Sequence, residues 1–455
     1  MRKTLLIIVL SLCAHNLFSQ QDSLLKKFKY RIDHYRAVNF NLGAGTQFNQ
    51  SEIPTVIYKS SGAAGSLGGG YYFLKSTDKI LLSVSGGLGT SFYTSNSNNQ
   101  TSTSKSSNFA AAPTFSVLNK WFSKKIFTEL GTDASLYYNT GKGDASNYTV
   151  PAKHKRANYS VAINTGVGMG RLENITDMQN ALWLYKELAT EKILSRQLTA
   201  DEQIELGRAI TKGNNTRVLD GRRRTKFILA TVDNYLQQKG VISKTDMNYF
   251  SSLNDILFFA FNNIRFAGTE KFIRLTPAVY SWNADATQND GINKNENRFD
   301  VKTALFSFGI NKYIPTNLVH QNNYGASAKL SYTDQRLADR NFTSGIVTGE
   351  TKINSIIKQA GVNLFFEHVI YPNTRTAISF KINSETGYQD FNKQTNLYEI
   401  ANLQGAVSYF ISYRTRFNMN IGGLYQKNPF IATQSSQGFP ESMQLYANAG
   451  INVSL

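Results

Sequence analysis

The stretch that decides the fold class is Met443-Gln444-Leu445-Tyr446-Ala447-Asn448-Ala449-Gly450-Ile451-Asn452-Val453-Ser454-Leu455. Every second residue from Met443 to Leu455 is apolar, and most of the residues between them are polar. This period of two places alternate side chains on opposite faces of a β-strand. A soluble β-sandwich also alternates, but it rarely sustains the pattern for so long, so the length favours a membrane-spanning strand.

The same alternation recurs along the chain, for example at Val38, Phe40 and Leu42 and again at Tyr159, Val161 and Ile163. We expect about fourteen such strands, beginning near residues 36, 63, 79, 107, 124, 157, 271, 298, 318, 355, 373, 397, 414 and 442. Within Ala304–Ile310 the apolar phase slips by one residue, which predicts a β-bulge.

Charged residues make up 18% of the chain and aromatic residues 12%. Beyond the N-terminal region, no stretch approaches the roughly 20 apolar residues that a membrane helix requires. Strands can cross a bilayer only if their backbone groups are satisfied by closure. We therefore predict a mainly β fold, a transmembrane antiparallel β-barrel of about 14 strands.

The N-terminus has the parts of a secretory signal peptide over residues 1–19. Arg2 and Lys3 precede an apolar run from Leu5 to Leu12, and Ser19 is a small residue at the expected cleavage point. The only cysteine, Cys13, lies inside this segment, so the mature chain is expected to contain no disulfide. The formal net charge of +18 suits a surface that faces anionic lipid headgroups or acidic polymers, but it is explained equally well by solvated lysines in loops. Nucleic acid is not expected as a partner outside the inner membrane.

The connections between the expected strands alternate in length, as short periplasmic turns and long outer loops do. The short links are Lys75–Asp78, Phe122–Lys124, Ile314–Thr316, Tyr371–Asn373 and Ser412–Arg414. The long polar segments are Ser95–Ser107, Asn139–Arg156, Asn283–Asn297, Thr333–Lys352 and Gln426–Glu441. An even number of strands then puts both chain ends in the periplasm, together with the segment between the sixth and seventh strands.

In that segment, residues 172–270, the spacing of apolar residues changes from a period of two to a period of about 3.6. We expect it to be a helical insert between the barrel residues 20–171 and 271–455. Three helix starts carry capping signals, at Thr176–Gln179, Thr199–Glu202 and Ser243–Asp246. One apolar stripe includes Ile228, Val232 and Leu236 and should end near Gly240. Such stripes can bury each other in a self-contained bundle or a lumen plug.

The run Arg222-Arg223-Arg224 in this insert is a candidate for docking an anionic partner, although short basic runs are more often solvated helix faces. A DNA-binding helix-turn-helix is disfavoured because the compartment is wrong and no companion basic surface accompanies the run.

Nothing in the sequence selects a catalytic, cofactor-binding or metal site. The four histidines after the signal segment, His34, His154, His320 and His368, lack metal-ligand spacing. There is no Gly-x-Ser-x-Gly motif, and Gly68-Gly69-Gly70 lies inside an expected strand. We therefore expect no enzyme activity and no cofactor.

Charged residues on the expected inner face are more informative, because rings of charge set ion preference in a pore and can also hold a plug. The candidates are Glu129, Asp133, Lys329, Glu367, Arg375 and Lys381.

The signal peptide, the alternating strands and the ending Asn448–Leu455 together resemble bacterial outer-membrane β-barrel proteins. The ending is similar to their C-terminal assembly signal, with Asn448, Gly450, Val453 and Leu455 at its defining positions. This resemblance implies insertion into the cell outer membrane by the barrel-assembly machinery. Leu455 departs from it, because aromatic residues are commoner at the last position. The Ser19-Gln20 junction and a composition rich in Asn, Lys and Tyr resemble proteins of the Bacteroidota.

These observations lead to three hypotheses about function. The first is a passive or gated transport pore whose lumen is modulated by the helical insert. The second is a non-transporting envelope anchor whose insert docks a periplasmic protein. The third, an adhesin that uses its outer loops, is weaker because those loops have few aromatic residues.

Overall fold

The chain forms one antiparallel sheet of fourteen strands. The computed structural model describes residues 21–53, 56–98, 103–146, 150–216, 221–258, 264–288, 290, 292–391, 394–412, 415–427 and 441–453. The strands are β1 (Ile32–Ile53), β2 (Val56–Ser76), β3 (Ile80–Asn98), β4 (Thr103–Ser123), β5 (Ile126–Ala145), β6 (Ala152–Asn174), β7 (Phe266–Thr287), β8 (Asn293–Pro315), β9 (His320–Thr343), β10 (Ile346–Asn373), β11 (Thr376–Phe391), β12 (Gln394–Ser412), β13 (Thr415–Lys427) and β14 (Glu441–Val453).

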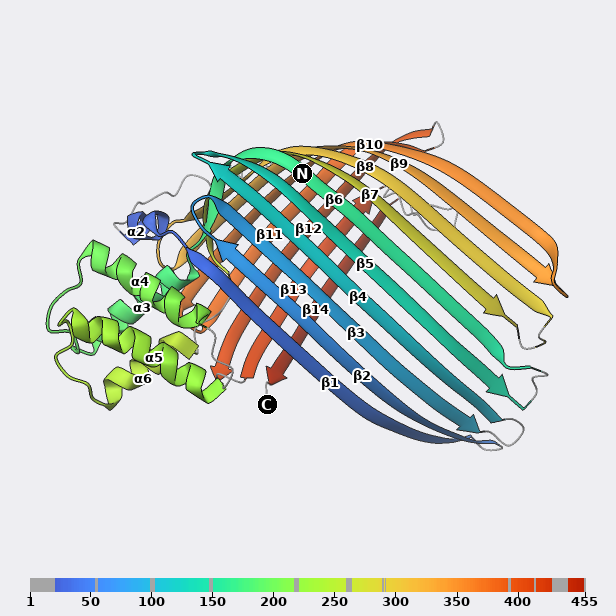
Figure 1. Ribbon diagram of the computed structural model, residues 1–455, viewed down its shortest axis with the longest axis horizontal. Helices are drawn as coiled ribbons and strands as arrows, with labels where there is room; N and C mark the ends of the chain where they lie inside the picture. The colour runs from blue at the N-terminus through green and yellow to red at the C-terminus, as the bar shows by residue number, and fades with distance from the viewer. Residues whose placement is uncertain are drawn as a thin grey trace.

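Each strand pairs with its neighbours in sequence order, from β1 to β14. The sheet curls, so that β11–β14 cross behind β1–β5 in Figure 1. Within the described ranges no pairing joins β1 to β14. The prediction of a mainly β, antiparallel barrel of about fourteen strands is confirmed, and the largest error in a strand start is nine residues, at β10 (expected near 355, observed at 346).

The polar segments that we expected to be long loops are largely strand. Ser95 and Ser106 are register partners in β3 and β4, with hydroxyl oxygens 2.7 Å apart. The segment Thr333–Lys352 contains a hairpin closed by Ser344 and Gly345 at φ of 52° and 78°, the tight turn that matches strand twist. The expectation was wrong because polar residues on both faces remove the alternation by which a strand is recognised.

Two further expected loops, within residues 139–156 and 283–297, are shortened in the same way by the ends of β5 to β8. Most of the segment Gln426–Glu441 lies outside the described residues. At the other end of the sheet the expected short links are short, and residues 77–79, 124–125, 316–319 and 374–375 connect their strands. The link after Ser412 lies outside the described residues.

The bulge expected in β8 is absent. Ala304 pairs with Pro277 and Ile310 with Lys271 in one unbroken register, and the register with β9 is also continuous there. The apolar phase slips because Val301 and Leu305 lie on the inner face, whereas the exposed Phe306 and Phe308 lie on the outer face.

The helices among the described residues lie at the end of the sheet that carries the short turns (Figure 1). They are α2 (Gln21–Lys27) before β1, and α3 (Thr176–Thr190), α4 (Ala200–Asn215), α5 (Gly221–Gln238) and α6 (Met247–Phe258) between β6 and β7. We call α3–α6 the helical module. None of the described helices is long and apolar enough to cross a membrane.

The helical module has its own buried core. The core includes Leu184 and Leu188 of α3, Leu206 and Ile210 of α4, Val232 and Leu236 of α5, and Tyr249, Leu253 and Ile256 of α6. The expected end of the third helix is confirmed, since α5 ends at Gln238 and Gly240 has a φ of 62°. Most of the module's apolar side chains are buried in this core, whereas Met247 and Phe250 of α6 are exposed.

One of the three expected capping boxes is present. The Thr199 hydroxyl accepts from the Glu202 backbone amide at 3.3 Å, and a Glu202 carboxylate oxygen accepts from the Thr199 amide at 2.8 Å. The capping boxes expected at Thr176–Gln179 and Ser243–Asp246 are not formed. The Thr176 hydroxyl instead accepts from the Arg265 amide, while the Ser243 hydroxyl donates to a backbone carbonyl and Asp246 caps α6.

A second buried cluster joins the module to the barrel. Leu24, Leu25 and Phe28, in and just after α2, pack with Ile175, Met178 and Leu182 at the start of α3. Ala267 of β7 and Leu318 of the β8–β9 turn complete this cluster. The N-terminal segment therefore fills the gap between the module and the sheet.

Candidate functional site

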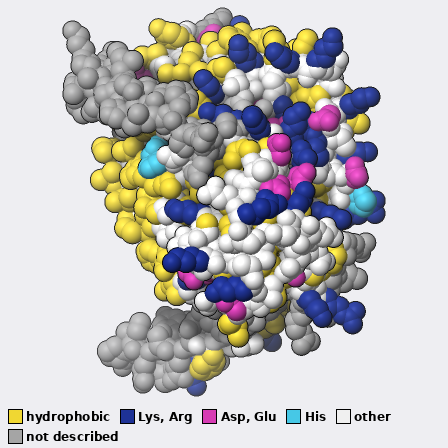
Figure 2. Space-filling model, turned by 90° about the vertical axis from the view of Figure 1, so that its left-hand side faces the viewer, with side chains coloured by type: hydrophobic (Ala, Val, Ile, Leu, Met, Phe, Trp, Pro, Cys, Tyr) yellow, Lys and Arg dark blue, Asp and Glu magenta, His cyan; other side chains and the backbone are white. Residues whose placement is uncertain are grey.

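Alternation separates an apolar outer face from an inner face that carries charge. On β5, Leu130 is 48% exposed on the outer face, whereas its neighbour Glu129 is 4% exposed on the inner face. Val167, Ile273, Phe308, Leu330 and Val362 are further outward residues, each about half exposed. Figure 2, which faces the end with the helices, shows hydrophobic side chains along one flank and many Lys and Arg side chains elsewhere.

Four charged side chains form a buried cluster on the inner wall of β4–β7. Lys120 Nζ lies 2.8 Å from Glu270 Oε2 and 3.5 Å from Glu129 Oε2. Arg274 bonds both carboxylates, at 3.0 Å to Glu270 and through Nε to Glu129. Two cations and two carboxylates balance, so this cluster stiffens the wall and leaves no net charge to attract an ion.

The expected lumen residue Glu129 is therefore neutralised by partners that the sequence did not single out. Lys120 and Arg274 also lie over the rings of Phe127 and Phe272, at 4.6 Å and 4.0 Å from the centroids. The sequence marks Lys120 and Arg274 only as charged residues at inward-facing positions of strands whose outward positions are apolar.

Asp133 keeps its charge exposed further along the same wall. Ser116 Oγ donates to one of its oxygens at 2.5 Å and Asn164 Nδ2 to the other at 2.8 Å. No ion pair within 4 Å is recorded for Asp133 in the described part of the chain. Its carboxylate therefore faces the lumen without a cationic partner among the described residues.

The opposite wall, formed by β9–β12, holds the other expected charges. Lys329 Nζ lies 2.5 Å from Glu385 Oε1, and the Tyr398 hydroxyl donates to the same oxygen at 3.0 Å. Glu367 accepts a bond of 2.8 Å from Asn323 Nδ2, and Lys381 is exposed on the inner face of β11. Sequence reasoning found Lys329, Glu367 and Lys381 but missed Glu385.

Arg375 does not line the lumen as we expected. It lies in the tight turn between β10 and β11, where a side chain is not held to the alternation of either strand. Its Nη2 donates to Asp255 of α6, so the pair ties the module to this turn. The expectation failed because the sequence gives no information about which helix lies over a turn.

A fully buried arginine anchors the junction between the module and β7. Arg265 donates to the carbonyl oxygens of Leu318, Asn317 and His320 at 2.9, 2.7 and 2.9 Å, and to Gln321 Oε1 at 2.5 Å. Its guanidinium carbon lies 5.0 Å from the centre of the Tyr371 ring. A charge this deep is stable only when its donors are paired, so Arg265 fixes the β8–β9 turn under the module.

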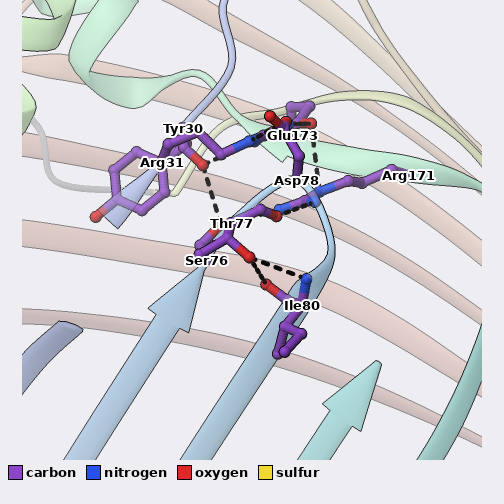
Figure 3. A network of polar contacts seen from close by, with 8 residues as sticks. All are labelled: Tyr30, Arg31, Ser76, Thr77, Asp78, Ile80, Arg171 and Glu173. Atoms are coloured by element: carbon purple, nitrogen blue, oxygen red, sulfur yellow. Dashed lines mark hydrogen bonds and ion pairs between the residues drawn. The ribbon is translucent and has the colours of Figure 1, made fainter. Parts of the chain in front are cut away.

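A second network, shown in Figure 3, joins the start of β1, the β2–β3 turn and the end of β6. Arg31, just before β1, donates to both oxygens of Glu173 at 2.7 and 2.9 Å and to Asp78 of the β2–β3 turn at 2.8 Å. Arg171 donates to the Thr77 carbonyl oxygen at 2.6 Å. The bond from Arg31 lowers the pKa of Asp78, so the network stays charged at neutral pH.

The remaining candidates are placed but not brought together into a site. Arg223 and Arg224 are exposed at the start of α5 (Gly221–Gln238), and Arg224 Nη2 is 3.4 Å from the Asn214 carbonyl oxygen. Arg222 lies in the same helix turn. In the assembly signal, Asn448 and Gly450 pair with Asn420 and Asn418, and Val453 ends β14. Leu455 lies outside the described residues.

Comparisons with known proteins give a general likeness only. No protein-family model and no curated protein matches the chain. Solved structures that resemble it include the translocator domain of the autotransporter NalP from Neisseria meningitidis, with 7% identity, 96% of this chain and 94% of that chain covered, and a TM-score of 0.24.

A TodX monoaromatic hydrocarbon channel mutant is 8% identical, with 95% of this chain and 92% of that chain covered and a TM-score of 0.28. The Ralstonia pickettii toluene transporter TbuX is 9% identical, with 95% of this chain and 92% of that chain covered and a TM-score of 0.27. At these scores the likeness assigns neither a family nor a function.

Proposed function

We propose that this chain is an outer-membrane β-barrel that passes solutes through its lumen, and that the helical module gates the mouth. The outer wall is covered by half-exposed Leu, Ile, Val and Phe side chains, as lipid contact requires. The inner wall carries Asp133, Lys329, Glu367 and Lys381, which suit a wet path.

The observation that carries the gating role is the way in which the module spans the rim. It is rooted on β6 and β7, and α4 contacts β1, six strands from β7 in the sheet order. On the other side, α6 is tied to the β10–β11 turn by Asp255 and Arg375. A body that touches these three parts of the rim lies over the opening, not inside the strands.

The orientation follows from the chain direction. β1 begins and β14 ends on the module side, and at the other end the strands extend as long polar hairpins such as β9–β10, which is the polar extension expected on the outer side of such barrels. The module is then periplasmic, and the long hairpins of β3–β4 and β9–β10 face outward. Insertion through the barrel-assembly machinery and contact with lipopolysaccharide are part of this proposal.

A deletion tests the gate directly. The Ile175 amide donates to the Arg265 carbonyl oxygen at 2.8 Å, so a short Gly-Asn turn can replace residues 176–264 while both strand ends are kept. We expect single-channel conductance in a planar bilayer to rise, or to appear, on deletion. A variant that lacks only residues 21–28 controls for loss of packing at the rim. Equal conductance and equal solute flux with and without the module would reject gating.

A further inference from the structure

A small recess lies in the inner wall at the junction between the module and the barrel. It has a volume of about 290 Å³ and lies between Ile264, just before β7, and the inner faces of β7–β12. Its polar lining comes from Tyr313, Gln321, Asn323, Glu367, Ser379 and Ser408. At the roughly 30 Å³ that a water molecule takes up in the liquid, the recess holds roughly ten non-hydrogen atoms.

The only charge among the described lining residues is the Glu367 carboxylate. A chain of hydrogen bonds orients it. Arg265 Nε donates to Gln321 Oε1, Gln321 Nε2 donates to Asn323 Oδ1 at 2.7 Å, and Asn323 Nδ2 donates to Glu367 Oε2 at 2.8 Å. Each amide oxygen accepts from the residue before it, so the amides cannot turn without breaking the chain.

Glu367 has capacity beyond this one bond. An ionised carboxylate can accept about four hydrogen bonds, and the structure records a single donor for it. Lys381 is its register partner on β11, but Lys381 does not line the recess, and no ion pair joins the two in the described chain. The carboxylate therefore presents a negative charge to whatever occupies the recess.

Aromatic rings complete the lining. Phe266 and Tyr313 lie edge to face with centroids 5.8 Å apart, and they are the rings available to a ligand, because the Tyr371 ring is 5% exposed and already lies under the Arg265 guanidinium. A carboxylate together with aromatic rings in a small recess, about half of whose lining is apolar, is the chemistry that recognises an ammonium group. The Arg265 guanidinium lies behind this lining, where its donors are taken by carbonyl oxygens and Gln321, so Glu367 is the charge that faces the recess. A sugar would also use the amides and hydroxyls, but it would gain nothing from the Glu367 charge.

We infer that this recess binds a small organic cation, with Glu367 as the residue that selects its charge. The inference rests on the proposed transport function, because it names the class of solute that the lumen would hold beneath the module. Burying an ammonium against Glu367 and the rings should favour it by at least about tenfold over an uncharged molecule of the same shape.

Calorimetric titration of the refolded full chain with choline, compared with its uncharged isostere dimethylbutanol, tests the charge selection without any mutation. We expect choline to bind at least about tenfold more tightly. Glu367→Gln keeps the shape and the bond from Asn323, and it should abolish the difference. Glu187→Gln, which removes an exposed carboxylate of α3, is the matched control and should preserve it.

Equal binding of choline and dimethylbutanol would overturn the inference, as would glucose binding that is insensitive to Glu367→Gln. No binding of choline at millimolar concentration would overturn it too. Loss of heat-resistant folded protein on a gel identifies a variant that fails to fold, and the isostere comparison then decides alone. Choline binding to a chain that conducts neither with the module nor after its deletion would leave this inference standing and reject the pore. Conductance after deletion of the module, with no choline binding by the full chain, would do the reverse.

Discussion

Replacing Arg265 with methionine should destabilise the barrel more than any surface change of the same kind. Methionine keeps an unbranched apolar stem but removes every donor. The carbonyl oxygens of Asn317 and Leu318 then lose the guanidinium bonds of 2.7 and 2.9 Å, whereas His320 keeps a bond from the Thr316 amide. Two orphan carbonyls, one buried and one partly buried, cost about 1–3 kcal/mol each, and the lost bond to Gln321 adds about 1 kcal/mol, so we predict a loss of about 3–7 kcal/mol.

The assay is equilibrium unfolding of the refolded protein from lipid vesicles in guanidinium chloride, followed by tryptophan fluorescence. Arg298→Met is the matched control, because the Arg298 side chain is 65% exposed and its pair with Asp300 is worth less than about 1 kcal/mol. Arg265→Lys, which keeps the charge but not the fork of donors, should lose about half as much as Arg265→Met. If Arg265→Met cost no more than Arg298→Met, the anchoring role of Arg265 would be refuted.

Three further predictions concern the module, the lumen and the outer face. Burial raises the pKa of Asp177 in the folded module, so the stability that this carboxyl contributes is fully present below its unfolded pKa and is lost as pH rises through its folded pKa. Asp177→Asn should therefore flatten the pH dependence of the module's protection from hydrogen exchange. An unchanged pH profile would contradict this. Lys381→Gln should shift the reversal potential in a salt gradient toward cation preference, and no shift would remove Lys381 from the ion path. Leu330→Lys should cost about 2–4 kcal/mol in vesicle unfolding, clearly more than Ser331→Lys on the inner face, and equal losses would argue against lipid contact at Leu330.

The barrel could be predicted from the sequence because its signal is local. Alternation at Val38–Leu42 or Met443–Val453 reports directly which residues share a face of a strand, so the strand number was predicted, and most strand starts were predicted to within five residues. The hairpin around Ser344 was mistaken for a loop because polar residues on both faces leave no period to detect. Val301 and Leu305 produced a false bulge because an inner wall can also contain apolar residues.

The charged sites could be predicted only in part, because pairing is not local. The polar phase put Glu129 on the inner face, but it could not show that Lys120 and Arg274, from other strands, neutralise it. Arg265 is separated from its carbonyl partners by more than fifty residues, and no pattern in the sequence marks it as buried. Glu367 was found as a lumen charge, whereas the recess around it depends on six strands and on Ile264.

The most direct test of the gate is a charge swap at the contact between Asp255 and Arg375. Breaking the pair with Asp255→Arg or Arg375→Asp alone should raise the open fraction in single-channel recordings, since the module loses its tie to the β10–β11 turn. The double variant, which restores an ion pair of opposite sense, should return the open fraction toward that of the native chain. Lys239→Glu, which breaks a pair with Glu205 inside the module, should leave gating unchanged. An open fraction that is the same in both single variants, the double variant and the native chain would contradict the proposal that the module gates the lumen.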